Sequence, residues 1–303
     1  MKKFLIYLFL TLSPLVVLYP IDFLYSQIAM RSNHKPIEAW YDLMHGKIDS
    51  DVVIMGSSRA YRHIDPSVID TILSVNSYNL GLSSGWINWQ IRKYNLYRKY
   101  NPKPSLIIQT IDFYTLGYIM GVEKEQFMPY FWNIPMRKEI ITYEPFSKWE
   151  KLLPLYRYRG YNLFLSSTPR TLTKGFKSED LSWQGEALAQ KDSISINHND
   201  VSAKMFDEYL SQANFEGIKV LFVYTPLFIE ATKIIKNLDE MYLMFQSYAD
   251  KYDIPILDYT YMGICYDTTY FYNATHLNKL GAEIFSVNLA NDIKKMGIID
   301  EVK

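Results

Sequence analysis

The sequence predicts an α/β fold in which one parallel sheet is covered by helices on both faces, a three-layer α/β/α arrangement. Two patterns support it: short apolar runs that each end at a glycine or a polar residue, and helical patterns between these runs. Short continuous apolar runs are typical of strands buried on both faces. Strands that alternate with helices favour parallel pairing. A length of 303 residues with 49% apolar content allows one large domain or one domain with a long insertion.

The apolar runs are predicted as strands, and the first three end at Gly56, Gly81 and Asp112. Asp65 and Pro66 fit the N-cap and the first position of a helix. The expected strands cover residues 51–56, 77–80, 105–111, 219–225 and 254–258. The expected helices cover residues 65–73, 86–100, 201–214, 229–252 and 278–295.

Residues 114–195 interrupt this alternation, because they are rich in aromatic residues and proline and show no clear sequence of strands and helices. We interpret them as an insertion after the third strand. Such an insertion would lie at the carboxyl end of the sheet, where ligands bind in open α/β folds. It is equally compatible with a lid that recognises the substrate and with a structural cap that touches no ligand.

The N-terminus resembles a membrane-targeting segment. Lys2 and Lys3 precede an uncharged stretch at residues 4–21, a length at the lower limit for a membrane-spanning helix. The lysines before it orient the remainder outside the cytoplasm. We therefore expect a signal anchor at residues 1–25, a connector at 26–50 and an α/β domain at 51–303, placed in the periplasm or on the cell surface. A cleaved signal peptide and a buried N-terminal helix are the alternatives.

Composition excludes several classes of function. Lysine plus arginine equals aspartate plus glutamate at 32 each, so no basic stripe indicates a nucleic-acid partner. The single cysteine, Cys265, allows neither an internal disulfide nor a cysteine-rich zinc site. There is no phosphate-binding loop, dinucleotide fingerprint or Gly-x-Ser-x-Gly motif. We therefore expect no cofactor and no metal.

Ser58 and His276 are the candidate reactive residues. Ser58 follows the first predicted strand, where a tight turn would expose its hydroxyl near free backbone amides. His276 lies in a loop before the last helix, and a serine with a histidine is the minimal nucleophile and base. In the alternative, Ser57 and Ser58 only satisfy turn hydrogen bonds. The other histidines are expected in solvated surface roles: His34, His45, His63 and His198.

Four short blocks, in the right order, resemble the SGNH (GDSL-like) hydrolase superfamily, in the Gly-Ser-Ser variant of its membrane-anchored bacterial members. The resemblance covers roughly residues 50–113 and 218–296 and implies a flavodoxin-like sheet. The blocks are Gly56-Ser57-Ser58-Arg59, Asn79-Leu80-Gly81, Thr110-Ile111-Asp112-Phe113 and Asn273-Ala274-Thr275-His276, followed by Gly281.

The resemblance implies that Ser58 is the nucleophile and His276 the general base. It also implies that the backbone amides of Ser58 and Gly81 bind the oxyanion. Two positions depart from the family pattern. Asn273 replaces the acid three residues before the histidine, which leaves a Ser-His dyad, an acid from elsewhere such as Asp267, or an impaired enzyme.

Asp112 is the second departure, because it replaces an asparagine of the third block. An ionised carboxylate cannot donate to an oxyanion. Asp112 must therefore be protonated, or instead fix the Ser58 loop or pair with Arg59.

The resemblance implies a membrane-anchored serine esterase or O-acyltransferase that acts on acyl groups of cell-envelope glycans through an acyl-serine. Its partners would be an acylated glycan or acyl donor, the membrane, and a multi-pass protein that exports acyl groups. The alternative is a catalytically impaired protein that binds or assembles components for surface-polysaccharide modification. A third interpretation is an α/β domain with no site here, in which Ser58 and His276 lie far apart.

Overall fold

The computed structural model describes residues 2–31, 35–112, 114–117, 124–143, 146–160, 172–183, 193, 195 and 198–299. The chain divides into two compact units. The smaller unit combines Met1–Asp42 with Glu123–Arg170, and the larger unit combines Leu43–Val122 with Thr171–Lys303. The N-terminal helix and much of the predicted insertion therefore belong to the same unit.

The larger unit is built on a parallel sheet with the strand order β2-β1-β3-β6-β7. Neighbouring strands are in a register that pairs Val53 with Tyr78 on one side and with Ile107 on the other. This order is the flavodoxin-like one, so the predicted sheet is confirmed. The strands are β1 (Val52–Met55), β2 (Ser77–Asn79), β3 (Leu106–Ile111), β6 (Lys219–Tyr224) and β7 (Ile256–Asp258).

The strand order reverses at β1, which pairs with both β2 and β3. In open parallel sheets, a reversal of this kind leaves a crevice at the carboxyl ends of the two inner strands. The turn after β1 and the loop after β3 both begin at this edge. The topology therefore brings the Ser58 turn and Asp112 to one place.

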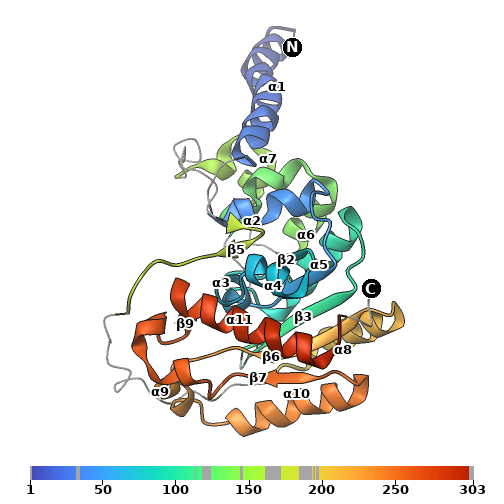
Figure 1. The fold of residues 1–303 in the computed structure, drawn as a ribbon. Helices are drawn as coiled ribbons and strands as arrows, with labels where there is room; N and C mark the ends of the chain where they lie inside the picture. Colours follow the sequence, from blue (N-terminus) through green and yellow to red (C-terminus); the bar gives the residue numbers. More distant parts are fainter. Residues whose placement is uncertain are drawn as a thin grey trace. The chain divides into compact units, whose positions relative to one another are not determined.

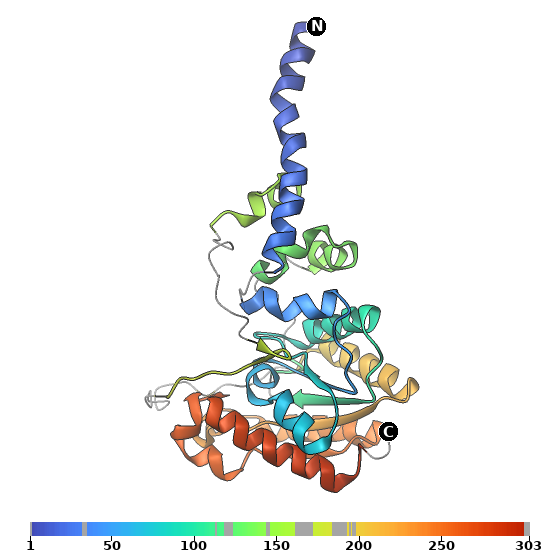
Figure 2. The ribbon, with the colours of Figure 1, turned by 45° about the horizontal axis from the view of Figure 1, so that its top comes forward.

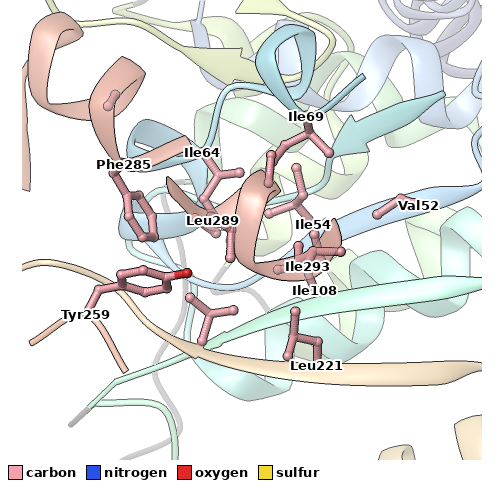
Figure 3. Close-up of a cluster of buried hydrophobic side chains, with 14 of the residues drawn as sticks. Val52, Ile54, Ile64, Ile69, Ile108, Leu221, Tyr259, Phe285, Leu289 and Ile293 are labelled. Carbon is pink, nitrogen blue, oxygen red and sulfur yellow. The ribbon is translucent and has the colours of Figure 1, made fainter. Parts of the chain in front are cut away.

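One face of the sheet is covered by helices α3, α4 and α11 (Figure 1). Val52 and Ile54 of β1 point into this layer, where they pack with Ile69 of α4 and Leu289 of α11 (Figure 3). Burying a side chain of this size contributes about 1.5–3 kcal/mol. The helices are α3 (Ser58–His63), α4 (Pro66–Leu73) and α11 (Lys279–Met296).

Helices α5, α8 and α10 cover the opposite face (Figure 2, where α8 is gold and α11 is red). Successive residues of a strand point to opposite faces, so Leu221 packs toward α11 whereas Phe222 stacks on Phe206 of α8 at 5.8 Å. The three-layer arrangement is thus confirmed. These helices are α5 (Ile87–Tyr100), α8 (Asp200–Phe215) and α10 (Leu238–Tyr252).

Several elements differ from the predicted ones. The helix expected at residues 229–252 is divided into α9 (Ile229–Lys233) and α10, and Asn237 takes the N-cap position of α10, which asparagine favours over a helix interior. Two short antiparallel hairpins were not predicted. They consist of β4 (Leu172–Thr173) with β5 (Phe176–Lys177), and of β8 (Phe271–Asn273) with β9 (His276–Leu277).

The smaller unit is held by a buried ion pair between Asp22 and Arg157, whose charged atoms are 2.8 Å apart. Trp132 Nε1 and the Leu155 amide also donate to the Asp22 carboxylate. A buried pair is tolerated when further hydrogen bonds satisfy its atoms. The short helices of this unit occupy residues for which no regular pattern was predicted: η1 (Lys124–Trp132), α6 (Ile134–Tyr143), α7 (Lys148–Leu152) and η2 (Tyr156–Tyr158).

The N-terminal segment forms α1 (Lys2–Ala29), and α2 (Lys35–Met44) follows within the predicted connector. The transmembrane helix predicted there is not found, because none of the helices in the described ranges combines the length and apolarity needed to cross a membrane. Apolar side chains along α1 are nevertheless exposed, among them Phe4, Phe9 and Val16.

Candidate active site

The turn that carries Ser58 is fixed by Gly56 and Ser57. Gly56 has a φ of +147°, and a Cβ built on it would lie 1.8 Å from Thr110 Oγ1 of β3, so only glycine fits between the two strands. Ser57 is the N-cap of α3 and accepts from the Arg59 amide at 3.4 Å. Ser58 therefore begins α3 directly at the carboxyl edge of the sheet.

Ser58 and His276 meet at this edge. Ser58 Oγ lies 2.7 Å from His276 Nε2, although 218 positions separate the two residues. His276 opens β9, where it pairs with Asn273 of β8. The expected contact between the two loops is thus observed, and the interpretation in which they lie far apart is wrong.

The second ring nitrogen of His276 faces an amide instead of a carboxylate. Nδ1 is 3.1 Å from Asn273 Oδ1 and 3.1 Å from Thr275 Oγ1. The Thr275 hydroxyl and backbone amide both donate to the same Asn273 oxygen. Because an amide oxygen only accepts, the proton lies on Nδ1. The lone pair of Nε2 is then free to accept the hydroxyl proton of Ser58.

Asp267 does not supply the missing acid. Its carboxylate accepts from the Thr269 amide at 2.8 Å and caps the short helix Thr268–Tyr270. Hydrogen bonds from Thr269 lower the pKa of this exposed carboxyl. No contact of Asp267 with His276 is found among the described residues. His276 Nδ1, which an acid from Asp267 would have to contact, faces Asn273 and Thr275 instead.

Burial, followed by the positive charges of Arg62 and Arg59, lowers the pKa of His276 to about 3, although the charge of Asp112 opposes this shift. At neutral pH the ring is therefore uncharged and able to accept a proton. Once protonated, it has no directly bonded anion to stabilise it, in contrast to a triad with an acid.

The imidazole of His276 packs between two rings. The Tyr272 ring stacks on it with centroids 5.4 Å apart and an interplanar angle of 11°. The His63 ring meets it edge-on at 6.0 Å. These contacts restrict rotation of the base.

The expectation of a solvated His63 is wrong, because α3 places this side chain beneath β9, where it is fully buried. His45 is exposed, and His198 is about half exposed beside Asp200. His34 lies outside the described residues.

Asp112 lies beneath the serine turn as a buried charge. Its Oδ2 accepts from Ser57 Oγ at 2.7 Å and lies 3.1 Å from Arg59 Nη2, and its Oδ1 accepts from the Tyr114 amide at 2.8 Å. Burial raises the pKa of this carboxyl, but the charge of Arg59 and the hydrogen bonds from Ser57 and Tyr114 lower it below the ordinary value. Asp112 is thus ionised, and it fixes the loop and pairs with Arg59 instead of donating to an oxyanion.

Gly81 does not present its amide as expected. The Gly81 N–H donates to Asn79 Oδ1 at 2.8 Å inside the core. A Cβ at Gly81 would lie 2.4 Å from the Tyr61 amide nitrogen, so this glycine permits close packing of the loop against α3. Because its N–H is already bonded to Asn79, Gly81 does not fill the predicted role of oxyanion donor in this geometry.

A pocket of about 380 Å³ opens beside the Ser58 hydroxyl. Ser84 and Gly85 line it, and Ser84 adopts a φ of +55°. Among the described residues, no acceptor is found for the Ser84 amide, whereas the Gly85 amide donates to Leu82 O. The lining residues are Ser57, Ser58, Arg59, Ser84, Gly85, Trp86, Gln90, Asp112, Tyr114, Thr115, Thr275 and His276.

Sequence reasoning did not identify the walls formed by Ser84, Trp86 and Tyr114. The run Ser83-Ser84-Gly85 directly after the second block could have indicated a further turn at this edge. The described residues contain no cluster of histidine, cysteine, aspartate and glutamate able to hold a metal ion.

No protein-family model and no curated protein matches the chain. Several solved structures are similar to this chain at low sequence identity. The lipase/acylhydrolase from Enterococcus faecalis has 12% identity and a TM-score of 0.40, with 81% of this chain and 95% of that chain covered. A carbohydrate acetylesterase family member from Sinorhizobium meliloti has 10% identity and a TM-score of 0.37, with 81% and 97% covered.

A GDSL-like lipase from Bacteroides thetaiotaomicron is also similar, with 11% identity and a TM-score of 0.39 over 81% of this chain and 88% of that chain. These values describe a distant likeness in which nearly the whole length of each solved protein is covered.

Proposed function

We propose that this chain is a serine esterase or O-acyltransferase in which Ser58 is the nucleophile and His276 the general base. The observation that carries the proposal is the 2.7 Å contact between Ser58 Oγ and His276 Nε2 beside an open pocket. A hydroxyl at this distance from a neutral imidazole nitrogen can transfer its proton as it attacks a carbonyl carbon. The fixed Nδ1 proton keeps the correct nitrogen available.

The reaction would proceed in two acyl transfers. Ser58 Oγ attacks the ester carbonyl, and His276 Nε2 takes the hydroxyl proton. The tetrahedral intermediate then collapses with loss of the alcohol, to which His276 returns the proton. Water or a sugar hydroxyl next attacks the acyl-serine, again with His276 as base, and releases a carboxylic acid or a new ester together with free Ser58.

The negative oxygen of the intermediate requires hydrogen-bond donors. We propose the backbone amides of Ser58 and Ser84 for this role, because both residues line the pocket and Asp112 is an ionised acceptor. Asn273 would orient the imidazole, while the pair of Asp112 and Arg59 would hold the turn.

We further propose an acylated glycan of the cell envelope as substrate or acyl donor. Two aromatic side chains support a sugar-binding surface: Trp86 and Tyr114 line the pocket with ring centroids 5.7 Å apart, and Tyr114 is 42% exposed. Aromatic faces of this kind provide apolar contact with a polar rim. We also propose that a multi-pass acyl-exporting membrane protein supplies the acyl groups for the transferase reaction.

Membrane anchoring on the extracytoplasmic side is also a proposal. It is supported by the exposed apolar side chains of α1, such as Phe4 and Phe9, which follow Lys2 and Lys3. If it is correct, the full-length chain sediments with membranes and detergent releases it. A full-length chain found entirely in the supernatant would contradict it.

A serine-directed fluorophosphonate probe tests the proposed chemistry. We expect covalent labelling of the wild-type chain at Ser58, and no labelling of Ser58→Ala or of wild type inactivated beforehand by an unlabelled fluorophosphonate. Ser67, on the exposed first turn of α4, gives a matched control, because Ser67→Ala should label like wild type.

The competing function is a non-catalytic binding or assembly protein. The absence of an acid at Asn273 and the lowered pKa of His276 favour it. A folded wild-type chain that resists the probe, yet retains affinity for an acylated polysaccharide, would support this alternative and contradict the enzyme.

A further inference from the structure

Helix α3 contacts both reactive residues. Ser58 is its first residue, and Arg62 and His63 are its last two. The last two residues contact the β8–β9 hairpin that carries His276. One short helix thus carries Ser58 at its first position and contacts the β8–β9 hairpin, which carries His276, through its last two residues.

His63 holds the backbone next to the base. Its Nε2 accepts the Leu277 amide hydrogen at 3.1 Å, and Leu277 directly follows His276. A nitrogen that accepts this hydrogen bond must be unprotonated, so the ring proton lies on Nδ1. No partner for Nδ1 is found among the described residues. A buried polar group without a partner lowers stability, so the unbonded Nδ1–H of His63 is unfavourable for the folded state.

Burial, together with repulsion from a protonated His276 and from the charges of Arg59 and Arg62, keeps the pKa of His63 well below its usual value. The ring therefore stays neutral and remains an acceptor. The backbone carbonyl of His63 also accepts from Ser286 Oγ at 3.3 Å. This second bond connects the end of α3 to α11 without involving the imidazole.

Arg62 acts on the ring of the base through Tyr272. Its guanidinium lies 5.8 Å from the centroid of the Tyr272 ring, and that ring stacks on His276. Glu179 holds the guanidinium in place with a 2.8 Å ion pair. Neighbouring residues of the same helix therefore contact Tyr272, which stacks on the His276 ring, and the backbone of Leu277, which follows His276.

We propose that Arg62 and His63 are positioning residues that set the distance between Ser58 Oγ and His276 Nε2. The inference rests on the proposed function, because it assigns these two side chains a role in that reaction. Neither side chain lines the pocket beside Ser58. They act through Leu277 and Tyr272, and His63 also through its edge-on contact with the His276 ring. A displacement of about 1 Å at a reacting pair can lower a rate about 10²-fold.

A matched pair of variants at His63 tests the proposal. His63→Gln keeps an acceptor near the position of Nε2, whereas His63→Met has a similar length and offers the amide only a weak thioether acceptor. We expect His63→Met to lower kcat for a short-chain p-nitrophenyl ester by about 10- to 100-fold, with KM within about twofold. His63→Gln should recover most of the loss, and fluorophosphonate labelling rates should follow kcat.

The control variant is Ser286→Ala, which removes the bond to the His63 carbonyl and leaves the imidazole in place. It should retain wild-type kcat even if it lowers the melting temperature. Equal kcat values for His63→Met and His63→Gln would overturn the positioning role. So would a wild-type kcat in His63→Met.

Arg62→Met gives an independent measurement on the second contact. We expect a smaller fall in kcat, about threefold to tenfold, because Tyr272 still stacks on His276 after the guanidinium is lost. The matched control is Glu179→Gln, which weakens the ion pair but keeps the guanidinium, and should fall between wild type and Arg62→Met. A wild-type kcat in Arg62→Met would restrict the positioning role to His63 and overturn the proposal for Arg62.

Failure of the proposed function can be separated from failure of this inference. If wild type neither labels nor turns over, the proposed function is wrong, and two measurements by NMR still test the positioning role. In His63→Met, but not in His63→Gln, the Leu277 amide should exchange faster and the His276 Nε2 resonance should move toward that of a free imidazole. Unchanged exchange and unchanged resonance would overturn the inference.

Discussion

Two groups of contacts extend from the serine turn, and only one of them contains charge. Ser58, His276 and Asn273 form a neutral series joined by contacts of 2.7 and 3.1 Å. Beside it, Ser57 bonds to the buried, ionised Asp112, which pairs with Arg59. The molecule therefore places its carboxylate beneath the loop of the nucleophile and an amide behind the base.

Because of this difference, one group of contacts fixes the geometry of the turn and the other determines the reactivity of the base. A buried ion pair makes removal of one partner costly, so it fixes the turn. An amide orients the imidazole but supplies no charge to the imidazolium. The Asp112 group should consequently govern stability, whereas the Asn273 group should govern the rate and its dependence on pH.

Substitution of the two adjacent serines should give the largest contrast. We expect Ser58→Ala to lower ester turnover by about 10⁴-fold or more, as in serine enzymes whose nucleophile is removed. Ser57→Ala should retain turnover but unfold more easily by about 1 kcal/mol, because a helix cap and a bond to Asp112 are lost. Steady-state kinetics measures the turnover, and urea unfolding measures the stability. A greater loss of turnover in Ser57→Ala than in Ser58→Ala would contradict the assignment of Ser58 as nucleophile and Ser57 as a structural residue.

Asp112→Asn tests the charged group. Arg59 would remain buried without its anion, and we expect a loss of about 3–5 kcal/mol in the free energy of unfolding. Because the pKa of Asp112 is lowered in the folded state, its stabilisation is present above the ordinary aspartate pKa and is lost as the pH falls through the folded value. Urea unfolding from neutral to acidic pH should show this loss in wild type and not in Asp112→Asn.

Asn273→Asp tests the neutral group by adding the missing charge. A carboxylate next to Nδ1 stabilises the imidazolium, so the pKa of His276 should rise. We expect kcat to increase by about 10- to 100-fold, which is less than the loss of about 10⁴-fold that the opposite change, Asp to Asn, causes in a serine protease. Asn273→Ala serves as the control for orientation and should lower kcat. A slower Asn273→Asp would show that this site does not depend on charge behind the base.

The smallest expected effect is the pH dependence of wild type. With the pKa of His276 near 3, the base stays neutral, and kcat/KM should be nearly constant from about pH 5 to pH 8. Asn273→Asp should instead lose activity on the acidic side at a higher pH, since its base is protonated earlier. An acidic limb near pH 6.5 in wild type would contradict the burial of the imidazole.

Much of the fold could be predicted because several of its strands are mainly apolar runs. Val52 to Met55 and Leu106 to Ile111 are buried on both faces, and only a covered parallel sheet accommodates such runs. The division at Asn237 and the two hairpins could not be predicted, because short elements depend on contacts with distant residues. Helices η1 and α6 of the smaller unit carry no strong periodic pattern.

The contact between Ser58 and His276 could be predicted because each lies in a recognisable block at a strand or helix end. The roles of Gly81 and His63 could not. The Gly81 amide is taken by Asn79 two residues away, and a motif does not reveal that choice. His63 sits in the polar sequence Arg62-His63-Ile64-Asp65, so its burial depends on β9 and α11 covering α3.

The most direct test of the Ser58–His276 pair is to trap the acyl-enzyme. Wild type and His276→Ala would be mixed with p-nitrophenyl acetate, quenched in acid within the first turnover and digested for mass spectrometry. We expect an acetyl group on Ser58 in wild type, and greatly reduced acetylation in His276→Ala. Acetylation of another residue, or equal acetylation of Ser58 in both proteins, would contradict the assignment of nucleophile and base.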